Sequence, residues 1–84
     1  MNNKALVEVY VPAAGKRFDV WIPLESRMYE VKQMVLKALE GLLEGMYQAN
    51  AESALCDADT GSIFDVNSVI AELGIKNGSC LLLI

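Results

Sequence analysis

The sequence contains no histidine among its 84 residues. Histidine is the side chain most often recruited for acid–base and nucleophilic catalysis near neutral pH, so its absence removes the commonest catalytic group. The two cysteines, Cys56 and Cys80, belong to no Cys-x-x-Cys pair, and we expect both to be free thiols. We therefore expect a protein that is not an enzyme.

Positive charge is also scarce, since seven basic residues stand against eleven acidic ones and give a formal net charge of -4. The basic residues form no stripe that would neutralise successive phosphates. No apolar run approaches the roughly 20 residues of a membrane-spanning helix, and the N-terminus MNNKALVEVYV lacks the regions of a signal peptide. These absences predict a cytoplasmic protein that binds no nucleic acid and does not span a membrane.

Residues suited to a metal ion or cofactor are few. Asp57 and Asp59 form an Asp-x-Asp pair, but the further ligands of a calcium loop do not follow. Aspartates in such a position are typical of turns, where the carboxylate accepts a backbone hydrogen bond. The stretch AAGKR at 13–17 lacks the upstream glycine and the following Ser or Thr of a phosphate-binding loop. We expect neither a metal nor a cofactor.

What the sequence does contain is apolar residues, 54% of the total against 21% charged, enough for one small folded domain over residues 1–84. Apolar and polar residues alternate over 6–11 and again over 17–22, with Pro12 to Gly15 between them, which predicts a β-hairpin. From Met28 the spacing changes to three and four residues, which predicts an amphipathic helix that Gly41 weakens and Gly45 ends. Ser26 is the expected helix N-cap.

The rest of the chain predicts shorter elements. Residues 54–58 and Ile63-Phe64, with the turn Asp59-Thr-Gly-Ser between them, are expected to form a second, weaker hairpin. A short helical connection over 66–73 ends at Gly74, and Asn77-Gly78 turns the chain into a final strand, 79–84. One amphipathic helix can cover only one face of the resulting sheet.

Three stretches resemble ubiquitin-like proteins and, in their order and spacing, the YukD/EsaB-like family associated with bacterial type VII secretion: FDVWIP, MYEVKQMVLKAL and DTGSIFDVNSVIAELGIKNGSCLLLI. The resemblance extends over nearly the whole chain. It implies an α+β fold, a ubiquitin-like β-grasp with a mixed five-stranded sheet in the order 2-1-5-3-4. One main helix covers one face of that sheet, and a short helix precedes the last strand.

Within that fold, the alternation assigns a face to each strand residue. The helix is expected to cover Val7, Val9, Val11, Phe18, Val20, Ile22, Leu81 and Leu83. The opposite face is expected to carry Leu6, Glu8, Tyr10, Asp19, Trp21, Cys80, Leu82 and Ile84. Trp21, Tyr10, Leu82 and Ile84 are predicted to lie close together as an apolar patch.

We interpret this patch as a protein-binding surface, with Glu8 and Asp19 setting the orientation of the partner. Two alternatives to a protein-binding surface remain: the residues pack between neighbouring strands, or they form a weak homodimer through the same face. The resemblance implies an accessory or regulatory component of a type VII secretion machine, which binds another component.

The competing β-grasp activity is that of a conjugated modifier or a sulfur carrier. It requires a flexible C-terminal Gly-Gly, whereas this sequence stops at Ile84 inside the expected strand. We expect no activation at this terminus.

Overall fold

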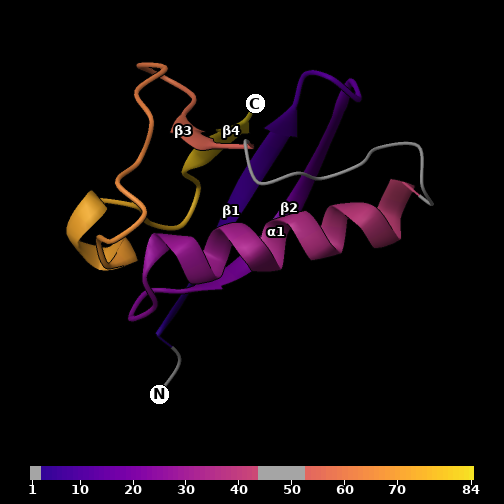
Figure 1. The fold of residues 1–84 in the computed structure, drawn as a ribbon. Helices are drawn as coiled ribbons and strands as arrows, with labels where there is room; N and C mark the ends of the chain where they lie inside the picture. Colours follow the sequence, from indigo (N-terminus) through magenta and orange to yellow (C-terminus); the bar gives the residue numbers. More distant parts are fainter. Residues whose placement is uncertain (1–2, 44–52) are drawn as a thin grey trace.

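The computed structural model describes residues 3–43 and 53–84. In chain order the elements are β1 (Lys4–Val11), β2 (Lys16–Pro23), α1 (Met28–Leu43), β3 (Leu55–Asp57), the short 3-10 helix η1 (Ile70–Leu73) and β4 (Cys80–Leu83). The strands form one mixed sheet in the order β2-β1-β4-β3, and α1 crosses one side of it (Figure 1). This arrangement confirms the predicted β-grasp class.

The N-terminal hairpin follows from the alternating pattern and from the four-residue turn that joins its strands. Val11 stands opposite Lys16, so Pro12 to Gly15 lie outside the ladder. The amide of Ala14 donates to the carbonyl of Val11 at 3.1 Å, and Gly15 adopts a φ of 63°, which favours glycine. The length of this turn fixes which β2 residue faces which β1 residue.

The centre of the sheet is the parallel pair of β1 and β4, in which Val9 stands opposite Leu81. Antiparallel pairing of β3 to β4 continues past β4, because Ala54 and Ile84 exchange backbone hydrogen bonds of 2.8 and 3.0 Å. The central position of the C-terminal strand agrees with the predicted order.

The prediction of a fifth strand is wrong for the described residues, which form four. Ile63 makes one isolated antiparallel bridge to Cys56, and its side chain is exposed. The chain turns away immediately afterwards, since the Asp65 carboxylate accepts the amide of Asn67 at 2.9 Å. The extended segment is therefore too short to form a strand.

Helix α1 buries one stripe of residues at spacings of three and four: Met28, Val31, Val35 and Leu39. The same spacing also predicts Ala38 in this stripe, but its side chain is exposed. Gly45, the predicted end of the helix, lies outside the described part of the chain.

The beginning of α1 is held by the loop that follows β3. The amides of Met28 and Tyr29 donate to the carbonyls of Ser68 and Val66, both at 2.9 Å. The Glu30 carboxylate accepts the amide of Arg27 at 3.1 Å. These acceptors satisfy the first amides of the helix, which the Ser26 hydroxyl was expected to do as N-cap.

The core lies between α1 and the sheet, and the predicted inward face agrees with it. Val7, Val9, Val11, Ile22, Leu81 and Leu83 are fully buried, with Phe18 and Val20 packed against them. The opposite side of the sheet is not covered by α1 and is therefore available for contact with a partner (Figure 1).

Candidate functional site

The open face of the sheet, the side opposite α1, carries all six residues predicted to bind a partner. Trp21 is 51% exposed and Ile84 57% exposed. Asp19 is also exposed, whereas Glu8, Tyr10 and Leu82 are half-buried. The alternation along each strand therefore assigned the six residues to the correct side.

Their arrangement on the open face differs from the expected single patch. Trp21 stands opposite Leu6, whereas Tyr10 stands opposite Arg17 on one side and Leu82 on the other. Leu6 and Tyr10 are four residues apart on β1, a separation of about 13 Å along an extended strand. The prediction that Trp21 lies close to Leu82 and Ile84 is therefore wrong.

A polar row separates the two ends of the face. Glu8 on β1 stands opposite Asp19 on β2 and Cys80 on β4. This row was not apparent from the strand patterns, because the register between strands decides which residues meet. The open face thus has a Tyr10–Leu82 end and a Trp21–Leu6 end, with two carboxylates between them.

At the Tyr10–Leu82 end, the aromatic ring is covered by a side chain of the same protein. The Arg17 guanidinium carbon lies 4.4 Å from the centroid of the Tyr10 ring. The same guanidinium pairs with Glu8, with 3.2 Å between Arg17 Nη1 and Glu8 Oε1. Arg17 was not among the predicted site residues, although alternation across a four-residue turn places it opposite Tyr10.

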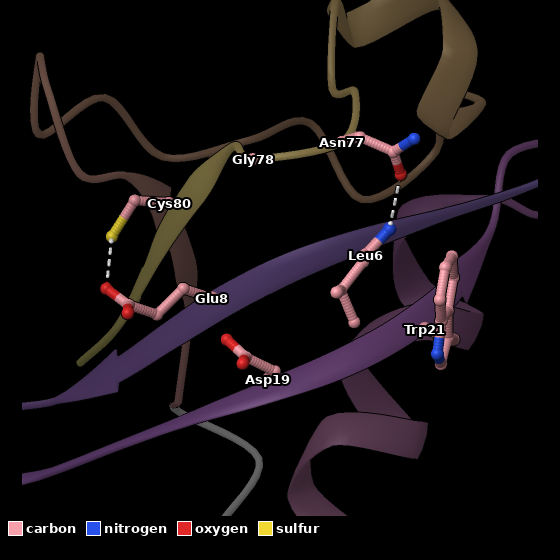
Figure 2. A pocket seen from close by; sticks show the side chains of 7 residues that line it. All are labelled: Leu6, Glu8, Asp19, Trp21, Asn77, Gly78 and Cys80. Carbon is pink, nitrogen blue, oxygen red and sulfur yellow. Dashed lines mark hydrogen bonds between the residues drawn. The ribbon is translucent and has the colours of Figure 1, made fainter.

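At the Trp21–Leu6 end, the open face is hollowed. The hollow has a volume of about 420 Å³ and is lined by Leu6, Glu8, Asp19, Trp21, Asn77, Gly78 and Cys80. Figure 2 shows the Trp21 ring beside Leu6, with the carboxylates of Glu8 and Asp19 grouped farther along the strands. Gly78, one of the lining residues, has no side chain, and a Cβ at this position would meet no atom within 4 Å.

The turn before β4 fixes one wall of the hollow. Asn77 Oδ1 accepts the amide of Leu6 at 2.8 Å (Figure 2), and the amide of Gly78 donates to the Leu6 carbonyl at 2.9 Å. Gly78 has a φ of 88°, a backbone conformation that residues other than glycine rarely adopt. These contacts hold the Asn77-Gly78 turn against β1.

Cys80 is the one nucleophilic group in the hollow. Burial raises the pKa of its thiol, and the hydrogen bond to Glu8, with 3.6 Å between Sγ and Oε1, raises it further. Cys56 is fully buried, and burial raises the pKa of its thiol too. Both thiols are free and are held in their protonated, weakly nucleophilic form.

Replacing Glu8 by glutamine is expected to speed the alkylation of Cys80 by iodoacetamide at pH 8 about threefold. The substitution removes the negative charge that disfavours the thiolate, so the pKa of Cys80 falls and more thiolate is present. Mass spectrometry of quenched samples measures the rate. Glu40→Gln, a change of the same charge on exposed α1, is the control, and equal rates in the two variants would contradict the Glu8 contact.

Among residues 3–43 and 53–84, no three or more Asp, Glu, Cys or His side chains are arranged to hold a metal ion. The Asp57 carboxylate instead accepts the amide of Asp59 at 2.8 Å, as expected for a turn. No helix in the described part of the chain is both long and apolar enough to cross a membrane.

The sequence matches the family model described as "WXG100 protein secretion system (Wss), protein YukD" over residues 6–83. No curated protein sequence matches it. Among solved structures, it is similar to a chain of the "MycP5-free ESX-5 inner membrane complex", with a TM-score of 0.84 and 19% identity. That match covers 98% of this chain and 21% of the other, so this chain spans about one fifth of its length.

Two isolated domains are similar over nearly their whole length. The ubiquitin-like domain of EccD5 from Mycobacterium xenopi has a TM-score of 0.81 and 21% identity, over 96% of this chain and 92% of that one. The ubiquitin-like domain of the Mycobacterium tuberculosis type VII secretion system protein ECCD1 has a TM-score of 0.76 and 16% identity. The match covers 96% of this chain and 97% of that domain. At these identities the likeness shows a shared ubiquitin-like fold.

Proposed function

Since the chain belongs to the YukD family of the WXG100 protein secretion system, we propose that it is a non-enzymatic, cytoplasmic interaction module of that system. The open face of its sheet docks on another protein of the secretion machine. The Trp21–Leu6 end supplies apolar contact, while Glu8 and Asp19 set the orientation of the partner.

The observation that carries this proposal is the exposed indole of Trp21 beside a hollow of about 420 Å³. Tryptophan is enriched among the residues that dominate interface energetics, and a half-exposed one gains most when a partner covers it. The other exposed aromatic residue of the described chain, Tyr29, lies on α1 and is not part of the lining of this hollow. The open face is therefore the better candidate for docking.

The nature of the partner is suggested by the similar structures. One is part of an inner membrane complex, and two are ubiquitin-like domains of EccD proteins. A cytoplasmic ubiquitin-like domain of the same system would meet such a complex on its cytoplasmic side. We propose a protein component of the inner-membrane secretion complex as the partner.

Site-specific photo-crosslinking in the host cell tests this proposal. With p-benzoylphenylalanine in place of Trp21, we expect a covalent adduct with a component of the secretion complex, identified by mass spectrometry. The same reagent in place of Tyr29, which is 46% exposed on α1, is the matched control and should give no such adduct.

Besides the absence of an adduct with a secretion component from position 21, two outcomes would contradict the proposed function. Adducts that form from position 29 and not from position 21 would assign docking to the helix. An adduct that joins two copies of this chain through position 21 would make the open face a homodimer contact.

A further inference from the structure

The open face presents an aromatic ring next to a carboxylate twice, and only one of the two pairs holds a cation. Tyr10 and Glu8 enclose the guanidinium of Arg17. Trp21 and Asp19 line the hollow at the other end of the face, and no lysine or arginine lines it. We propose that this hollow receives an arginine side chain of the docked partner protein, an inference that rests on the proposed function.

The Tyr10 pair shows what such an arrangement binds. A guanidinium is planar and weakly hydrated, so it stacks on an aromatic ring while its N–H groups remain free to reach a carboxylate. Arg17 does both at once, with its guanidinium carbon 4.4 Å from the ring centroid and Nη1 3.2 Å from Glu8. The backbone of this sheet therefore spaces an aromatic and an acidic side chain suitably for arginine.

The Trp21 pair offers the same groups to a ligand from outside. Asp19 and Trp21 are two residues apart on β2, on the same side of the sheet and about 7 Å apart along the strand. Trp21 is half exposed, and no hydrogen bond or ion pair of the Asp19 carboxylate occurs within the described residues. Indole is also the aromatic group that attracts cations most strongly.

Space and charge both favour a basic side chain in the hollow. Its volume, about 420 Å³, falls in the range of small-ligand sites and leaves room for a guanidinium with its aliphatic stem. Leu6 and the indole supply apolar surface for the stem, and the two charged residues of the lining, Glu8 and Asp19, are both acidic. Arg17 offsets part of the Glu8 charge, so Asp19 is the main anionic contact.

Fluorescence titration with two matched tripeptides tests this inference, because Trp21 is the single tryptophan of the sequence. We expect acetyl-Gly-Arg-Gly-amide to change the Trp21 emission saturably, with a dissociation constant on the order of millimolar. Acetyl-Gly-citrulline-Gly-amide, which has nearly the same shape but no charge, should give no saturable change. In a ¹H–¹⁵N NMR spectrum, the shifted signals should include the Trp21 indole and the Gly78 amide.

Asp19→Asn is expected to weaken binding of the arginine peptide about three- to fivefold, the range of an exposed ion pair. Glu40→Gln removes the same charge from the exposed side of α1 and should leave the affinity unchanged. Unaltered thermal unfolding midpoints would show that both variants fold. Equal binding of the two peptides, or equal losses in the two variants, would overturn the inference.

The inference and the proposed function fail in different ways. If crosslinking from position 21 captures a secretion component but the citrulline peptide binds as well as the arginine peptide, the face docks without an arginine. If position 21 captures no secretion component, the proposed function fails whatever the peptides do. If both tests succeed, replacing the crosslinked partner's arginine by glutamine should weaken the complex by a factor similar to that of Asp19→Asn.

Discussion

Replacing Leu81 by alanine is expected to lower the free energy of unfolding by about 3 kcal/mol. The Leu81 side chain is 1% exposed and lies on β4, the strand between β1 and β3. Its truncation leaves a cavity in the core that surrounding side chains can fill only in part. An 84-residue domain is typically stable by roughly 4 to 13 kcal/mol, so the loss is a large share of the total. Urea denaturation followed by circular dichroism measures it.

Leu82→Ala is the matched control, because it is the same substitution one position later on the same strand. Leu82 is half-buried on the open face, and we expect its truncation to cost about 1 kcal/mol or less. A loss for Leu82→Ala equal to that for Leu81→Ala would contradict the assignment of the two side chains to opposite faces of the sheet.

Replacing Trp21 by alanine is expected to weaken binding to the crosslinked secretion component about 30-fold or more. The substitution removes the largest exposed side chain of the open face and one wall of the hollow next to Leu6. Isothermal titration calorimetry with the purified component gives the dissociation constants. Because Trp21 is half exposed in the free protein, we expect its loss to change the free energy of unfolding much less than Leu81→Ala does.

Tyr29→Ala is the control for this affinity measurement, since it removes an exposed aromatic ring from α1. We expect its dissociation constant to stay within about twofold of that of the unmodified protein. A similar loss of affinity in the two variants would mean that the partner contacts the helix as well as the sheet, contrary to docking through the open face alone.

Much of the fold could be predicted because local patterns determine it. Alternation gave the inward-facing residues of β1, β2 and β4, and the change of spacing at Met28 gave the first residue of α1. Local patterns could not decide whether residues 63–64 form the fourth of the five expected strands. Two apolar residues at 63–64 are compatible with a strand or a single bridge, and the Asp65 turn that follows decides between them.

The face of the sheet that carries the candidate site was predicted, but the arrangement of residues on it was not. Each strand's own pattern shows that Glu8, Tyr10, Asp19 and Trp21 share a face. Which of them are neighbours depends on the register between strands, set by the turn length in the hairpin and by tertiary packing in the parallel pair. The position of Arg17 opposite Tyr10 could have been predicted from the four-residue turn, whereas the hollow next to Leu6 and Gly78 depends on the parallel pairing and became visible only in the structure.

The parallel pairing of β1 with β4 has a consequence for the time at which the open face forms. Glu8 and Cys80 stand opposite each other although 72 residues separate them in sequence. The ribosome makes β1, β2 and α1 first, and a hairpin without its third strand is at best marginally stable in water. The chain between β1 and β4 must close into a long loop before the two strands can pair, and this closure is slow. The hollow beside Trp21, which Asn77, Gly78 and Cys80 help to line, therefore exists only after β4 has been synthesised.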